Sequence, residues 1–185
     1  MNLNEWFAKG LTADEYISAM NVNQEGMQRI LESFSLTTEE VNELKVLKDK
    51  GMKVIALSED WCGDAMLNNP ILLKIAEEIG MEVRFLLRDQ NLELMDQYLT
   101  NGTSRAIPIY VFIKENGEEH AVWGPRAKEI QVMVDDERSK LPSQDEPDFK
   151  EQQIEMYKRL MSSYQEDSTI WHVVAESIIE TLNKQ

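Results

Sequence analysis

The hydrophobic positions in the first fifty residues recur at helical spacing. Met27, Ile30 and Phe34 lie three or four residues apart, which places them on one face of a helix. Residues 12–15 (TADE) and 37–40 (TTEE) each have a threonine followed three residues later by a glutamate, the pattern of a capping box. The first third of the chain is therefore predicted to be helical, with helices beginning near residues 12 and 37.

The pattern changes at residues 54–57 (VIAL), a short continuous apolar run typical of a strand buried on both faces. Beyond it the predicted elements are a helix over 65–79, a strand over 82–87, a short helix over 92–99, strands over 109–113 and 119–123, and a helix over 127–140. Asn116-Gly117 between the last two strands is a hairpin turn signal. Strands that alternate with helices imply a parallel pair joined by a right-handed crossover. The predicted fold is α/β, a mixed sheet flanked by helices.

The last part of the chain carries two more helical stripes after residues 141–147 (LPSQDEP), which interrupt the pattern. The stripes are Ile154, Tyr157, Leu160, Met161 and Tyr164, then Ile170, Trp171, Val174, Ile178 and Leu182. We expect a helical hairpin packed on the same core. The predicted organisation is an N-terminal helical extension (1–36), an α/β domain (37–140) and a C-terminal helical extension (141–185).

Composition narrows the classes of partner. The 185 residues carry a formal net charge of −15, so phosphate backbones are repelled and nucleic acid is not an expected partner. The acidity favours solubility, with a docking surface for a basic protein as the alternative. There is no apolar run long enough to cross a bilayer, and the N-terminus has no secretory signal. With one cysteine and no internal disulfide, a cytoplasmic location is expected.

The single cysteine lies in residues 58–70 (SEDWCGDAMLNNP), between the first predicted strand and a helix. A cysteine at a helix N-terminus faces unpaired N–H groups, which favour the thiolate, the nucleophilic form. The order strand, Trp61-Cys62-Gly63-Asp64-Ala65, helix resembles the thioredoxin superfamily, whose redox motif is Trp-Cys-Gly-Pro-Cys. The chain resembles bacterial thioredoxin-like proteins that have one cysteine in a Trp-Cys-Gly-Asp motif and extra terminal helices.

Further matches follow in the same order. Pro70 lies where thioredoxins carry the proline of the active-site helix, and residues 105–108 (RAIP) resemble the cis-proline loop. The resemblance implies a cis bond before Pro108 and an Ile107 backbone edge open to a peptide strand. It also implies a substrate groove walled by Trp61 and by Trp123-Gly124, although core packing is an equally open interpretation of Trp123.

The chain departs from the family motif at three positions. Ala65 replaces the second cysteine, so a dithiol–disulfide cycle cannot close within this chain. Asp64 replaces the proline of the motif. Ala56 stands where thioredoxins bury an aspartate that serves the second cysteine. The losses at residues 56 and 65 are mutually consistent and suggest a site adapted to one thiol.

Charges beside Cys62 act in opposite directions. Carboxylates at Glu59, Asp60 and Asp64 disfavour a nearby thiolate and raise its pKa, while Arg105 on the cis-proline loop is expected to lower it. Activated thiols at helix N-termini have pKa values of about 3.5–7.5. The Cys62 pKa is therefore expected near the top of this range or slightly above it.

These observations favour a monothiol thiol–disulfide exchange protein. Cys62 is the predicted nucleophile, acting on a disulfide between a client protein and a low-molecular-weight thiol. The predicted docking residues are Trp61, Gly63, Asp64, Arg105, Ile107, Pro108, Trp123 and Gly124. No metal site or cofactor is expected, because the chain lacks clustered Cys and His ligands.

Two alternatives stay open at this point. The first is a redox-inactive thioredoxin-fold module that uses the cis-proline groove for protein–protein interaction. The second is an iron–sulfur cluster shared by two chains and two small thiols, which the acidic surroundings of Cys62 disfavour because such a cluster is already anionic.

Overall fold

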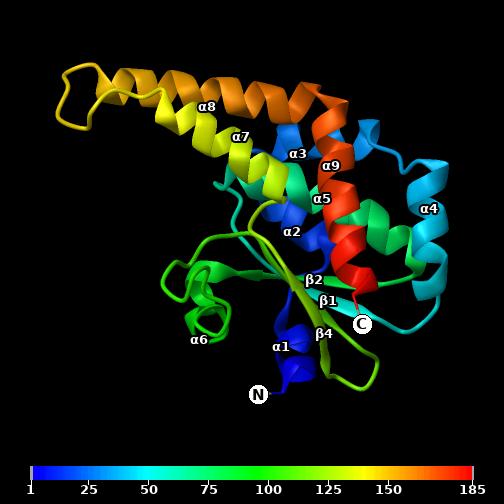
Figure 1. The fold of residues 1–185 in the computed structure, drawn as a ribbon. Helices are drawn as coiled ribbons and strands as arrows, with labels where there is room; N and C mark the ends of the chain where they lie inside the picture. Colours follow the sequence, from blue (N-terminus) through cyan, green and yellow to red (C-terminus); the bar gives the residue numbers. More distant parts are fainter. Residues whose placement is uncertain (1, 185) are drawn as a thin grey trace.

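The computed structural model describes residues 2–184 and has a four-stranded mixed sheet at its centre (Figure 1). The strands are β1 (Lys53–Ser58), β2 (Glu82–Leu87), β3 (Ile109–Ile113) and β4 (Glu119–Trp123), in the order β2-β1-β3-β4. β1 pairs parallel to β2 and antiparallel to β3, and β3 pairs antiparallel to β4. The α/β class predicted from the alternation of strands and helices is confirmed.

The two faces of the sheet are covered unequally. Alternate residues of β1 point in opposite directions, so Val54 and Ala56 join a large core while Ile55 and Leu57 join a smaller one. The smaller core is closed by α1 (Leu3–Lys9) and α6 (Leu92–Met95). All remaining helices that contribute buried side chains to these two clusters lie on the face of the large core.

The N-terminal helices are α2 (Ala13–Ala19), α3 (Gln24–Ser33) and α4 (Thr38–Leu44), the last followed by the 3-10 turn η1 (Lys45–Leu47). Both predicted capping boxes are present, with Thr12 and Thr37 accepting from the backbone N–H of the glutamate three residues on. Between α1 and α2, Leu11 forms an isolated antiparallel bridge with Phe85 at the edge strand β2. This bridge extends the sheet edge in a way that the sequence pattern did not indicate.

The helix after β1 is α5 (Gly63–Ile79), which begins two residues earlier than predicted, directly after Cys62. It ends at Gly80 in the left-handed conformation (φ 69°), which glycine adopts without steric cost. Pro70 lies inside the helix and is buried. The turn η2 (Arg88–Gln90) precedes α6, which is shorter than the predicted helix over 92–99.

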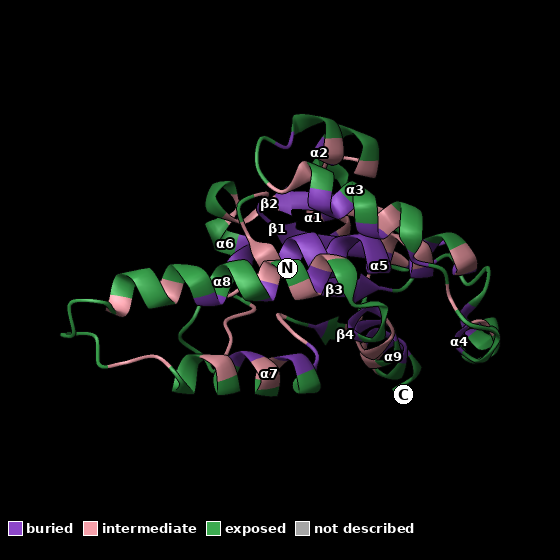
Figure 2. Cartoon of the chain, turned by 90° about the horizontal axis from the view of Figure 1, so that it is seen from above, coloured by how far each residue is buried: buried purple, intermediate pink, exposed green. Residues whose placement is uncertain are grey.

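The C-terminal part contributes α7 (Lys128–Ser139), α8 (Phe149–Glu166) and α9 (Ser168–Asn183). Figure 1 shows α7 and α8 side by side above the sheet, with α9 turning back towards it. The large core includes buried side chains from α2, α5 and α9, so the terminal helices share one core with the sheet. Figure 2 shows that α5 is largely buried, whereas α8 is exposed over much of its length.

Candidate functional site

Cys62 lies at the N-cap of α5, a helix of 17 residues, at the end of the loop that follows β1. The residue is half-buried and packs against the smaller core. Its Sγ donates to the carbonyl oxygen of Ile107 at 3.4 Å, and the Ile107–Pro108 peptide bond is cis. The thiol and the loop before β3, 45 residues apart in sequence, are therefore in direct contact.

The environment of Cys62 favours the neutral thiol. Burial, followed by the negative charge of Asp64, raises the pKa of Cys62 to about 11. The backbone N–H groups of Ala65 and Asp64 and the guanidinium of Arg126 act in the opposite direction but are outweighed. With this pKa only about one molecule in 10⁴ carries a thiolate at pH 7. The expectation of a pKa near 7.5 or slightly above it is wrong, because the sequence shows the helix end and the charges but not the burial.

Two of the acidic neighbours of Cys62 hold loops in place instead of surrounding the thiol. The Oε1 atom of Glu59 accepts from the backbone N–H of Asp89 at 2.8 Å. The Oδ2 atom of Asp60 accepts from the backbone N–H groups of Asn21 and Val22 at 2.7 and 3.2 Å. Asp60 thereby holds the segment between α2 and α3 next to the loop that carries Cys62.

Asp64 is engaged by side chains distant in sequence. Its Oδ2 lies 2.6 Å from Nη2 of Arg126, and its Oδ1 accepts from Nε of Arg126 at 2.9 Å. The hydroxyl of Tyr164 donates to the same Oδ1 at 3.2 Å. The Asp64 and Arg126 side chains are only 12% and 17% exposed, so this bidentate pair is shielded from water. It joins α5 to the loop before α7 and to α8.

The cation beside the site is Arg126 and not Arg105, which was expected to stabilise the thiolate. Arg105 is exposed and forms a bidentate pair with Asp96, with Nε 2.6 Å from Oδ1. Sequence reasoning missed Arg126 because it lies 62 residues from Asp64. The available signal was the position of Arg126, two residues after Gly124, which is the last of the predicted groove residues.

Trp123 is a core residue and not a groove wall. It is 5% exposed, stacks on Tyr110 with ring centroids 5.2 Å apart, and donates from its indole N–H to the hydroxyl of Ser177. Ile107 and Pro108 are buried as well, so the loop faces Cys62 mainly through its backbone. Gly124, with φ 127°, lies against the Pro108 carbonyl, where a Cβ atom would collide.

A buried polar network lies behind the cysteine. Tyr110 donates to Asn69 at 2.8 Å, the Asn69 amide donates to Ser58 at 3.0 Å, and Ser58 is 3.0 Å from the hydroxyl of Tyr16. These residues come from β3, α5, β1 and α2, and all four are buried. Buried polar groups that are fully paired fix the relative positions of the elements that carry them. This network fixes the end of β1 and the first turns of α5, from which the Cys62 loop extends.

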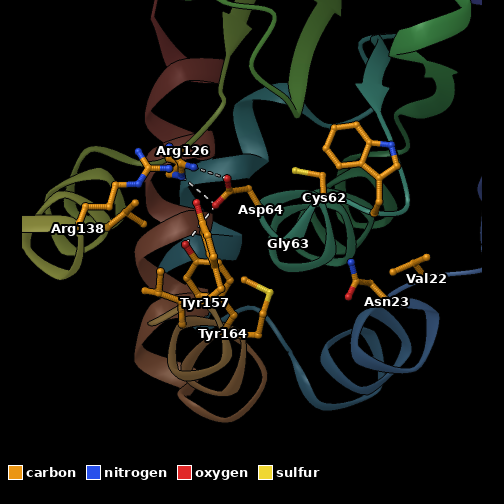
Figure 3. A pocket seen from close by; sticks show the side chains of 13 residues that line it. Val22, Asn23, Cys62, Gly63, Asp64, Arg126, Arg138, Tyr157 and Tyr164 are labelled. Carbon is orange, nitrogen blue, oxygen red and sulfur yellow. Dashed lines mark hydrogen bonds and ion pairs between the residues drawn. The ribbon is translucent and has the colours of Figure 1, made fainter. Parts of the chain in front are cut away.

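Cys62 opens on a cleft of about 450 Å³ between the start of α5 and the helices α7 and α8 (Figure 3). Among the predicted site residues, Trp61, Cys62, Gly63 and Asp64 line it. The other lining residues are Val22, Asn23, Arg126, Val134, Arg138, Tyr157, Leu160, Met161 and Tyr164. The C-terminal extension therefore supplies one wall of the site, and a Cβ on Gly63 would collide with the tip of Met161.

No group of three or more His, Cys, Asp or Glu side chains arranged to hold a metal ion occurs within residues 2–184. No helix in the described part of the chain is long and apolar enough to cross a membrane.

A family model described as Thioredoxin matches residues 10–138, which is more than half of the chain. The matched segment begins before α2 and so includes α2, α3 and α4 as well as the sheet. No curated protein matches this sequence significantly.

Solved structures resemble the whole chain in fold. A protein of unknown function from Pseudomonas aeruginosa aligns with a TM-score of 0.69 at 15% identity, covering 97% of each chain. An HIV epitope scaffold aligns with a TM-score of 0.68 at 15% identity, covering 97% of this chain and 98% of its own. A thioredoxin from Fasciola hepatica is 29% identical over 55% of this chain and 89% of its own, with a TM-score of 0.34. The first two show that other proteins combine this sheet with terminal helices in the same arrangement.

Proposed function

We propose that this chain, which belongs to the thioredoxin family, is a binding module in which the cleft beside Cys62 holds a ligand. The observation that carries this proposal is the combination of an open cleft with a thiol whose pKa is raised to about 11. A thiol that is ionised in about one molecule in 10⁴ at pH 7 is a weak nucleophile in the resting protein. The cleft itself remains available for binding.

The surroundings of the cleft support a binding role. Trp61 is 49% exposed, and the Arg88 guanidinium lies 4.9 Å from its ring centroid. Tyr157, which lines the cleft from α8, is 43% exposed. Exposed aromatic side chains beside a mostly apolar cleft are typical of binding sites. The site differs from the groove predicted at the cis-proline loop, because α8 lines it and Ile107 and Pro108 do not.

Monothiol exchange is the second candidate, favoured by the position of Cys62 at the N-cap of α5 and on the cleft wall. In that reaction the Cys62 thiolate attacks a disulfide between a client protein and a small thiol. A new disulfide forms between Cys62 and one sulfur, and the other sulfur leaves as a thiolate. A second thiol then attacks the Cys62 disulfide and releases the protein. The client, the small thiol and the expected cytoplasmic setting belong to this proposal.

The rate of alkylation of Cys62 as a function of pH separates the two candidates. The binding module predicts a midpoint above pH 9 and no turnover with a mixed disulfide of a small thiol and a model peptide. A midpoint below pH 8 with rapid exchange would make monothiol chemistry the function. The variant Asp64→Asn tests the electrostatic part, because removing a negative charge beside the thiol lowers its pKa.

The fold of that variant needs its own measurement, since Asp64→Asn also leaves the half-buried Arg126 without its carboxylate. A circular dichroism spectrum and an unfolding midpoint establish whether the variant is folded. Asp60→Asn is the matched control for the loss of one negative charge from this loop. The Asp60 carboxylate accepts from the backbone N–H groups of Asn21 and Val22.

A further inference from the structure

The charge of the cleft beside Cys62 differs in sign from the net charge of the whole molecule. The chain has a net charge of −15, yet the charged side chains that line the cleft are Arg126, Arg138 and Asp64. The lining therefore carries one more positive than negative charge. In an otherwise acidic protein, a local excess of positive charge in a concave site selects for anions.

The two arginines are not equally available. Arg126 is occupied by Asp64 and also donates from Nη1 to Gln131 at 2.8 Å. Arg138 is exposed, and no carboxylate within residues 2–184 lies within 4.0 Å of its guanidinium. Figure 3 shows the Arg138 side chain extending towards Arg126 at one side of the cleft. Arg138 is therefore the arginine of the cleft that is available to a bound anion.

The remainder of the cleft wall is apolar. Trp61, Leu160 and Met161 line it, together with Val22 and Val134. Its volume of about 450 Å³ lies within the range of about 300–1,000 Å³ that is usual for small-molecule sites. A ligand that fills this space therefore needs an apolar body as well as a negatively charged end.

We propose that the cleft binds a small organic carboxylate with an apolar body, with the carboxylate at Arg138 and the body against Trp61 and Met161. A carboxylate fits because a guanidinium offers it two parallel N–H donors, and such charge-assisted pairs are stronger than neutral hydrogen bonds. Asp64 does not compete for Arg138, since both of its oxygens are engaged by Arg126. This inference rests on the proposed binding function and specifies its ligand class.

The test is isothermal titration calorimetry of the full-length protein with three probes of equal chain length: octanoate, octanamide and octylammonium. The inference expects octanoate to bind most tightly and octylammonium least tightly. It also expects Arg138→Gln to weaken octanoate binding about tenfold or more, the loss expected for a charge-assisted hydrogen bond. Binding of octanamide should be nearly unchanged in that variant.

Arg29→Gln is the matched control, because Arg29 is an exposed arginine on α3 that does not line the cleft. This variant removes the same charge from the whole molecule and should leave octanoate binding within about twofold of the parent. Equal weakening by both variants would mean a general effect of net charge and would overturn the inference.

The remaining outcomes separate this inference from the proposed function. If octanoate and octanamide bind equally, and Met161→Ala weakens both, the cleft is a binding site but the anion specificity is wrong. If none of the probes binds but an acidic apolar peptide does, the occupant is a peptide and the small-molecule assignment is overturned. If Cys62 alkylates with a midpoint below pH 8 and exchanges rapidly with the mixed disulfide, the proposed function fails. Octanoate binding that Arg138→Gln weakens would still support the carboxylate site in that case.

Discussion

The two helices of the C-terminal hairpin arise from similar sequence patterns but have different surroundings. The apolar side chains of α9 are nearly all buried: Ile170, Trp171, Val174, Ala175, Ile178, Ile179 and Leu182. In α8 the buried residues are Met156, Leu160 and Tyr164, while Ile154 is 55% exposed and Tyr157 is 43% exposed. The sequence pattern predicts that both helices pack on the same core, each through an apolar stripe.

The difference follows from what each helix contacts. α9 packs against α5, β4, α4 and α7, so its apolar face meets helices and the sheet. α8 contacts the sheet less and passes over the first turn of α5, where Met161 approaches Gly63. An apolar stripe on a helix therefore indicates contact with other apolar side chains. It does not indicate whether these side chains belong to the core or to the wall of a cleft.

The largest expected effect is on α9. Ile178 is fully buried in the large core, so Ile178→Ala should lower the free energy of unfolding by about 2–5 kcal/mol through lost burial and the resulting cavity. Urea denaturation at pH 7 measures the loss. Ile178→Val removes a single methyl group and should cost about 0.5–1.5 kcal/mol. A loss below about 1 kcal/mol for the alanine variant would show that α9 is not part of the core.

The next effect concerns Cys62 on the α8 side of the molecule. Its pKa is raised from 9.0 to about 11 in the folded protein, so the unfolded chain releases this proton first as pH rises. Stability is therefore complete below pH 9 and falls between pH 9 and 11, by at most about 3 kcal/mol. Urea denaturation across this range measures the loss, which should be smaller in Cys62→Ser. Part of the loss above pH 10 should remain in that variant, because burial also raises the pKa of Tyr16 to about 12. An equal loss in the two proteins would show that Cys62 does not contribute.

A smaller effect is expected where α8 covers the thiol. Met161→Ala removes a side chain that lies over Gly63 and so admits water to the cleft. Because burial is the main cause of the raised pKa of Cys62, alkylation at pH 8 should become about 3- to 10-fold faster. The control is Met156→Ala, a buried residue of α8 outside the cleft lining. If the two variants changed the rate equally, loosening of α8 as a whole would explain the result.

The smallest effect on stability is expected at the outer part of α8. Ile154→Ala should change the free energy of unfolding by no more than about 0.5 kcal/mol, because the side chain is already mostly in water. It is chemically the same substitution as Ile178→Ala and should be measured in the same urea titration. A loss approaching that of Ile178→Ala would mean that the outer part of α8 is packed as tightly as α9, contrary to the difference described above.

The local pattern of the sequence determined most of the fold. The strands over 109–113 and 119–123 were predicted with the bounds that the structure has, because each is a short apolar or alternating run next to a clear turn signal. The capping boxes at Thr12 and Thr37 involve residues three apart, so they form without reference to the rest of the chain. The single thiol and its place before a helix were equally visible, because they depend on neighbours in sequence.

Only the tertiary structure decided the character of the site. Arg126, which pairs with Asp64, lies 62 residues from it in the sequence. Tyr164, which donates to the same carboxylate, lies 100 residues from it. Trp123 joins the core because pairing of β3 with β4 places it opposite Tyr110. The pKa of Cys62 is raised chiefly by burial, which is the combined effect of all elements packed around it. Long-range contacts and solvent exclusion are properties of the folded chain, and no local pattern of residues encodes them.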